Sequence, residues 1–150
     1  MSPAGALRRT RPTLTDRPRS DVALTIAEVL DTARAGLTRL RPVDLAAAVA
    51  EGAHVVDIRP AAQRASEGEL PGALVVERNV LEWRCDPTSD ARLPEAIDHD
   101  VTWVIVCQEG YTSSLAASAL QELGLHRSTD LEGGQSALRA LGLAPGPHAG

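Results

Sequence analysis

Short apolar runs alternate with helix-like segments along most of the chain. The runs are rich in Val, Ile and Leu and predict four strands, within residues 53–58, 73–76, 101–106 and 126–131. The segments around them predict helices over residues 23–35, 45–50, 61–66, 113–123 and 135–141. Strands that alternate with helices favour an α/β fold, in which a mostly parallel sheet is flanked by helices on both faces.

Residues 77–100 interrupt this alternation. Their pattern is irregular and predicts only one helical turn, at residues 79–83. Cys85 then falls in an expected loop, where it is either an incidental cysteine or a resolving thiol for a second cysteine. Trp83, in the same region, and Trp103 are expected to be packing residues.

The chain divides into a body and three flanking segments. We assign a disordered Arg- and Pro-rich tail to residues 1–20, an accessory helix to 21–38, a single domain to 39–143 and a flexible end to 144–150. Asp21 is expected to cap the accessory helix, and Gly36 to end it. This helix either packs on the body or mediates dimerisation, so the oligomeric state stays open.

A cysteine lies at the junction of a strand and a helix. Cys107 follows the apolar run 101–106, and a loop containing Gly110 leads into the helix over 113–123. The N–H groups of such a loop and of a helix start favour negative charge, and the thiolate is the reactive form of cysteine. We therefore expect Cys107 to be a nucleophile. Asp57 also ends a strand, so both residues are expected to face one pocket.

The charge distribution bears on possible partners. The formal net charge is −5. Residues 1–20 hold five Arg and one Asp, a charge of +4, which leaves −9 on the remainder. An acidic body is not typical of a nucleic-acid binder, and no apolar run approaches the roughly 20 residues of a membrane span.

The cysteine count and the amino-acid bias of the chain indicate its cellular compartment and the kind of genome that encodes it. Two cysteines provide no disulfide framework, and we expect a reducing, cytoplasmic location. The chain has no Phe, and its fifteen basic residues are all Arg. This bias, together with many Ala residues, is typical of a GC-rich bacterial genome.

Four segments form an ordered set of motifs. They are Val56-Asp57-Ile58-Arg59, Glu67-Gly68-Glu69-Leu70-Pro71-Gly72-Ala73, Cys107-Gln108-Glu109-Gly110-Tyr111-Thr112-Ser113 and Leu131-Glu132-Gly133-Gly134. Together they resemble the strand end, turn, active-site loop and final turn of the rhodanese superfamily of sulfurtransferases, over about residues 39–143. The resemblance implies a rhodanese-like α/β fold with a mostly parallel five-stranded sheet.

The resemblance also implies a reaction. Cys107 would take a sulfane sulfur from a donor, hold it as a persulfide and pass it to a thiol or another nucleophilic acceptor. The residues implied to surround this sulfur are Gln108, Glu109, Gly110, Tyr111, Thr112 and Ser113. Gly110 would let the loop curl, and the hydroxyls of Thr112, Ser113 and Ser114 would donate to the sulfur or cap the helix. We expect no cofactor and no metal, because the four His residues are scattered.

Several positions depart from the family pattern. Glu69 stands where many members have His, Leu138 where many have an aromatic residue, and Gln108 and Glu109 where thiosulfate-using members often have basic residues. An acidic side chain near the sulfur disfavours a dianionic donor such as thiosulfate, so we expect a protein or small-molecule persulfide. The related phosphatase chemistry needs an Arg that closes the loop, but Thr112 and Ser113 hold the candidate positions.

Two supporting residues and two other functions stay open. Asp57 and Arg59 either shape the pocket and position the loop, or form a structural pair of a buried carboxylate and an arginine. The principal alternative to a sulfurtransferase is a rhodanese-like binding or regulatory module with an inert cysteine. The second alternative function is a redox sensor that uses oxidation of Cys107.

Overall fold

The computed structural model describes residues 22–143. The elements are α3 (Ile26–Ala35), η2 (Pro42–Asp44), α4 (Leu45–Ala50), β1 (His54–Asp57), α5 (Ala61–Glu67), β2 (Leu74–Val75), η3 (Arg78–Val80), α6 (Leu81–Cys85), β3 (Trp103–Val106), α7 (Thr112–Glu122), β4 (Thr129–Asp130) and α8 (Gly134–Ala140). The predicted tails at 1–20 and 144–150 lie outside these residues. No helix among the described residues is long and apolar enough to cross a membrane.

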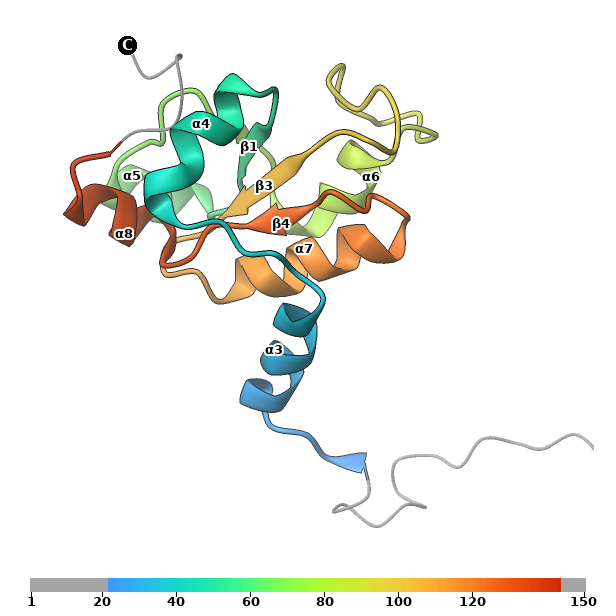
Figure 1. Cartoon of the computed structure of the whole chain (residues 1–150), viewed down its shortest axis with the longest axis horizontal. Coiled ribbons are helices and arrows are strands. Elements are labelled where there is room, and N and C mark those ends of the chain that lie inside the picture. The colour runs from blue at the N-terminus through green and yellow to red at the C-terminus, as the bar shows by residue number, and fades with distance from the viewer. Residues whose placement is uncertain (1–21, 144–150) are drawn as a thin grey trace, which may run out of the picture.

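The sheet is parallel throughout and has the order β2-β1-β3-β4 (Figure 1). The expected fifth strand is wrong for residues 22–143, where a single bridge between Leu40 and Leu131 lies beyond β4. Leu40 donates to the carbonyl of Asp130 and accepts from the N–H of Glu132. Pro42 follows two residues later and has no N–H with which to extend the ladder, so the chain turns into η2 instead.

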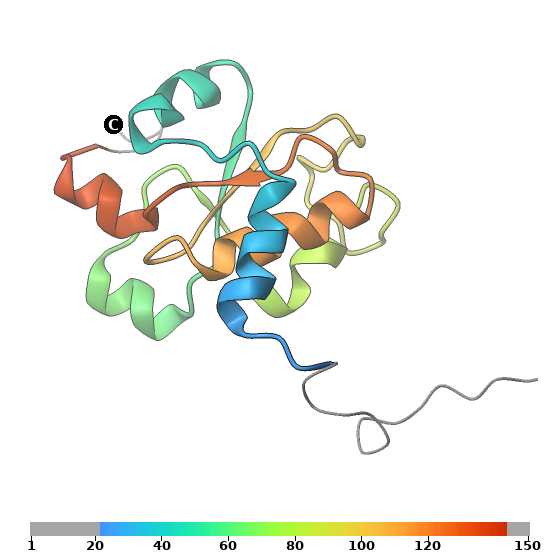
Figure 2. The same cartoon turned by 60° about the horizontal axis from the view of Figure 1, so that its bottom comes forward.

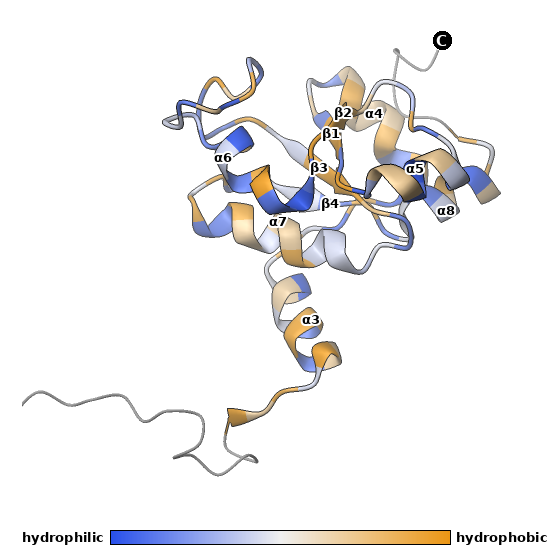
Figure 3. Cartoon of the chain, turned by 180° about the vertical axis from the view of Figure 1, so that it is seen from behind, coloured by the Kyte–Doolittle hydropathy of each residue, from blue (hydrophilic) through white to orange (hydrophobic). Residues whose placement is uncertain are grey.

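Alternate residues of the central strands feed two separate cores. In β3, Trp103 and Ile105 pack with α6 and α7, whereas Val104 and Val106 pack on the opposite face with Leu45 of α4 and Leu138 of α8. All four β3 side chains are buried, as a parallel strand covered on both faces requires. Figure 3 shows hydrophobic residues along β1 and β3 in the middle of the molecule.

The accessory helix packs on the body. Helix α3 lies against α7 and projects from the rest of the chain (Figures 1 and 2). It begins later than predicted, because Thr25 and Glu28 form a capping box in which each side chain accepts from the other's N–H. Asp21, the predicted cap, lies outside the described residues. Gly36 ends the helix as predicted.

The region 77–100 contains more structure than its pattern indicated. Cys85 ends helix α6 and is fully buried, so its placement in a loop is wrong. Leu81 and Cys85 are four residues apart and turn the same face of this short helix into the core. Trp83 lies between them and is 59% exposed, so it is not the packing residue expected, whereas Trp103 is fully buried as predicted.

The burial of Cys85 disfavours ionisation of its thiol. Burial first, and then the charge of Glu82, raises the pKa of Cys85 from 9.0 to about 12. In the unfolded chain the Cys85 thiol has a pKa near 9.0. Its contribution to the free energy of unfolding is therefore lost as pH rises from about 9 toward 12.

At neutral pH we expect iodoacetamide to label Cys107 in the native protein and to leave Cys85 unlabelled, because only a thiolate reacts readily. Peptide mass spectrometry before and after denaturation measures this, and both cysteines should react once the chain is unfolded. Native labelling of Cys85 at a rate similar to that of Cys107 would contradict the buried placement.

Candidate active site

Three strand ends meet at one edge of the sheet. Asp57 is the last residue of β1, Cys107 follows β3, and Asp130 ends β4. The strands are parallel, so these three residues lie at the same carboxyl edge, where ligands of open α/β sheets bind. The shared edge for Asp57 and Cys107 was predicted; Asp130 was missed, although it also closes a strand segment.

The loop after β3 wraps around the cysteine sulfur. Cys107 is only 5% exposed, and its Sγ accepts hydrogen bonds from the N–H of Gly110 at 3.2 Å and from that of Ser113 at 3.4 Å. Ser113 lies in the first turn of α7, so the sulfur faces a helix N-terminus as well as the loop. Both donors stabilise negative charge on the sulfur.

The carbonyl groups of the loop are held by the N-terminus of α8. The N–H of Gln135 donates to the Cys107 carbonyl at 2.9 Å, and the N–H of Ser136 donates to that of Gln108 at 3.0 Å. In a trans peptide the N–H points opposite to the C=O, so the N–H groups of Gln108 and Glu109 point away from α8. Among the described residues, neither N–H has a hydrogen-bond partner.

This close approach of α8 to the loop requires glycine. Gly134 has φ +59°, and a Cβ there would overlap the carbonyl oxygen of Cys107. Gly110 has φ +83°, and its Cβ would lie 2.6 Å from the backbone nitrogen of Gly133. A side chain at either position would push the loop and α8 apart.

Asp57 and Arg59 form a fully buried ion pair, with Arg59 Nη2 at 2.8 Å from Asp57 Oδ2. Arg59 also donates from Nη1 to Gln108 Oε1 at 2.9 Å and from Nη2 to the carbonyl of Gly68 at 2.9 Å. The pair therefore matches the structural interpretation, and its bond to Gln108 also ties it to the cysteine loop.

The hydroxyls at the start of α7 take neither of their predicted roles. Ser113 Oγ and Ser114 Oγ both donate to Asp130 Oδ2, at 2.8 and 2.7 Å, and α7 has no side-chain cap. Within the described chain the hydroxyl of Thr112 has no hydrogen-bond partner. Asp130 is fully buried and also accepts two bonds from Arg39. This carboxylate fixes the first turn of α7 to the end of β4.

Of the other residues singled out in the sequence, Gln108 is buried and Glu109 is exposed. Gln108 Nε2 donates to Ser136 Oγ at 3.0 Å, and that hydroxyl donates to Glu109 Oε2 at 2.7 Å. Glu109 is exposed, and Glu69, where many members have His, is exposed and paired with Arg64. Leu138 is a buried core residue on the far side of the sheet.

Two residues outside the predicted site contact the loop. Arg34 of α3 and Arg39 both donate to the Gly110 carbonyl, at 2.7 and 2.9 Å. Nothing in the sequence pattern separates these two from the other Arg residues, because the contacts depend on how α3 docks. Helix α3 and the loop also border an apolar groove of about 500 Å³, lined by Ile26, Ala27, Leu30, Tyr111, Thr112 and Leu115.

A comparison with known families matches residues 42–141 to the rhodanese-like domain. The chain is a member of the rhodanese-like domain family. Within residues 22–143, no three His, Cys, Asp or Glu side chains gather in a way that could hold a metal ion. No curated protein matches this chain.

The names of solved structures similar to this rhodanese-like chain suggest more than one activity. A protein of unknown function from Rhodopseudomonas palustris, described as a possible tyrosine phosphatase, is 31% identical, with a TM-score of 0.74; the match covers 83% of this chain and 96% of that one. A human single-domain sulfurtransferase is 21% identical, with a TM-score of 0.56 and coverage of 68% and 95%. Thiosulfate sulfurtransferase from Pseudomonas aeruginosa is 24% identical, with a TM-score of 0.56 and coverage of 73% and 21%. The last two support the fold alone.

Substitution of Gly134 by Ala tests the close approach of α8 to the cysteine loop. Gly142 is the matched control, because its φ is +66° and nothing lies within 4 Å of its Cβ position. Both variants place Ala in the left-handed region, at about 1–2 kcal/mol. Gly134→Ala should lose about 1–3 kcal/mol more, from the overlap with the Cys107 carbonyl. Denaturant unfolding measures the difference, and equal losses in the two variants would rule out the tight contact.

Proposed function

We propose that this rhodanese-like protein is a sulfurtransferase that carries sulfane sulfur as a persulfide on Cys107. The observation that carries the proposal is the set of backbone N–H groups around the Cys107 sulfur. Two N–H groups donate to Sγ, and the N–H groups of Gln108 and Glu109 are left without partners in the described chain. A loop of this kind suits an anion that is larger than a thiolate by one sulfur atom.

The reaction is an exchange of one sulfur atom between thiolates. The Cys107 thiolate attacks the outer sulfur of a donor persulfide, a new S–S bond forms, and the donor leaves as its thiolate. The persulfide on Cys107 then carries the negative charge on its outer sulfur. An acceptor thiolate attacks that outer sulfur and takes it, which regenerates the Cys107 thiolate. No electrons are gained or lost overall, so no cofactor is required.

The rim of the loop favours a persulfide donor over thiosulfate. Glu109 is exposed at the rim and Gln108 is neutral, so neither supplies the positive charge that a dianion would need. The arginines near the loop direct their guanidinium groups to the carbonyl of Gly110 or to buried carboxylates. We therefore infer a small-molecule or protein persulfide as donor and a thiol as acceptor.

Phosphatase chemistry, which the name of the Rhodopseudomonas relative suggests, fits this loop poorly. It needs an arginine fork at the end of the loop to hold the oxyanion. Thr112 and Ser113 occupy that end, and Ser113 Oγ is already bonded to Asp130. The side chains present offer no bidentate donor to a phosphate.

The test is intact-mass analysis after incubation with a small-molecule persulfide. We expect a gain of one sulfur atom in the wild type and in Cys85→Ala, its loss on adding a thiol, and no gain in Cys107→Ser. Thiosulfate should give markedly less. Reversal by the thiol separates the persulfide from a sulfinic acid of similar mass.

The other outcomes identify the alternatives. A wild-type protein that gains no sulfur from either donor would be a binding module rather than a sulfurtransferase. Rapid formation of a sulfenic acid without sulfur uptake would indicate a redox sensor. Full loading by thiosulfate would leave the enzyme class in place and overturn the inferred donor.

A further inference from the structure

A residue from outside the family domain contacts the cysteine loop. Arg34 belongs to α3, and the match to the rhodanese-like domain begins at residue 42. Its Nη2 donates to the Gly110 carbonyl at 2.7 Å, and its Nε donates to Ser114 Oγ at 3.0 Å. One guanidinium therefore bridges the loop and the first turn of α7.

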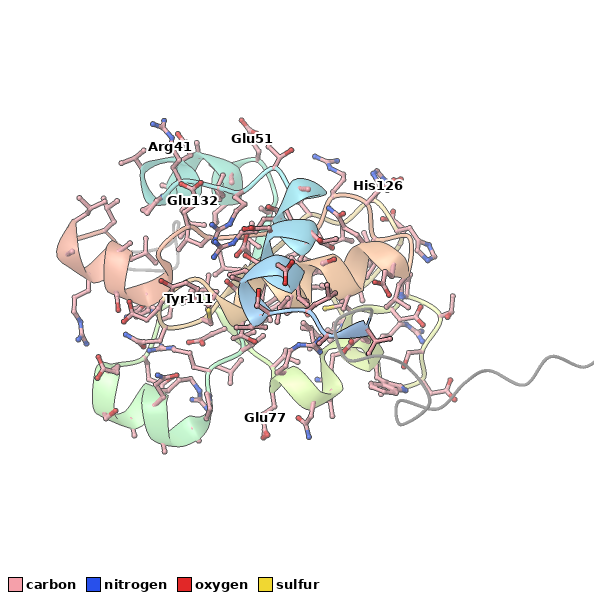
Figure 4. All side chains as sticks on the ribbon, turned by 90° about the horizontal axis from the view of Figure 1, so that it is seen from below. Arg41, Glu51, Glu77, Tyr111, His126 and Glu132 are labelled. Atoms are coloured by element: carbon pink, nitrogen blue, oxygen red, sulfur yellow. The ribbon has the colours of Figure 1, made fainter. Side chains whose placement is uncertain are left out.

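Arg34 contacts both residues of the Gly110–Tyr111 peptide. The Gly110 carbonyl accepts from Arg34, and the ring of Tyr111, the next residue, lies 5.6 Å from the Arg34 guanidinium carbon. Figure 4 shows Tyr111 beside α3. With the carbonyl held toward the arginine, the N–H of Tyr111 points the opposite way, away from Arg34.

Arg34 and Arg39 differ in whether they also bind a buried carboxylate, and this difference makes the role of Arg34 testable by substitution. Arg39 also reaches the Gly110 carbonyl, but it holds the buried carboxylate of Asp130 as well, so its loss would strand a buried charge. Arg34 has no carboxylate partner among the described residues. Its removal therefore takes one of two donors from the Gly110 carbonyl without breaking a buried ion pair.

We propose that Arg34 is a positioning residue that couples the accessory helix to Cys107 by fixing the Gly110–Tyr111 peptide. The guanidinium orients the Tyr111 N–H toward the sulfur side and adds positive charge beside the loop. Lysine can replace it only in part, because a single ammonium group lacks the planar fork that reaches Gly110 and Ser114 together. The inference rests on the proposed function for its biological meaning, but the reactivity of Cys107 is measured without any sulfur donor.

The test compares the rate of alkylation of Cys107 by iodoacetamide at neutral pH in four proteins. These are the wild type, Arg34→Gln, Arg34→Lys and Arg41→Gln. Arg41 is an exposed arginine that pairs with Asp44 at the start of α4, away from Tyr111 (Figure 4). We expect Arg34→Gln to react about three- to tenfold more slowly, Arg34→Lys to recover only part of the rate, and Arg41→Gln to match the wild type.

Thermal unfolding of each variant separates positioning from stability, and all four midpoints should be similar. If Arg34→Gln does not fold, Arg34→Lys, the milder change, carries the test. Wild-type rates in Arg34→Gln would overturn the proposal, and so would full recovery in Arg34→Lys, because charge alone would then be sufficient. A protein that never forms a persulfide but shows these rate changes would contradict the proposed function and leave the role of Arg34 intact.

Discussion

The geometry of the site depends on donors outside the cysteine loop that bind its carbonyl groups. The first two N–H groups after Gly134 in α8 hold the carbonyls of Cys107 and Gln108, and two arginines hold that of Gly110. Each bond turns the following N–H away from its donor. A short loop is thereby given a set of amides that can bind an anion, without any basic side chain of its own.

The rest of the fold brings these donors within reach. The parallel sheet places the ends of β1, β3 and β4 along one edge, so the loop, the buried Asp57–Arg59 pair and Asp130 are neighbours. Asp130 has four donors for its two oxygens, as a buried carboxylate requires. Glycine at 134 allows α8 to approach, because any side chain there would occupy the place of the Cys107 carbonyl.

The sequence alone predicted the features of the structure that local patterns determine. Apolar runs identified β1 and β3, and they placed Cys107 correctly between a strand and a glycine-containing loop at the carboxyl edge of the sheet. Cys85 was misplaced because its helix is only five residues long, although the four-residue spacing from Leu81 was visible. The missing fifth strand follows from Pro42, whose lack of an N–H was equally visible.

The contacts that complete the site could not be predicted from the sequence. Asp130 lies at a strand end, but the donors to its carboxylate come from two distant segments, Arg39 and the first turn of α7. Arg34 is one of fifteen arginines, and only the docking of α3 on α7 brings it to Gly110. The hydroxyls of Ser113 and Ser114 were expected to serve the sulfur or the helix and instead bind Asp130. Such roles are set by tertiary packing rather than by spacing along the chain.

In the proposed reaction, the amides of the loop hold the outer sulfur of a persulfide on Cys107. A crystal structure of the protein after reaction with a small-molecule persulfide tests it most directly. We predict the outer sulfur inside the loop, within hydrogen-bond distance of the N–H groups of Gln108, Glu109 and Tyr111. An outer sulfur directed into solvent, or a loop that turns its carbonyls inward, would contradict this role of the loop amides.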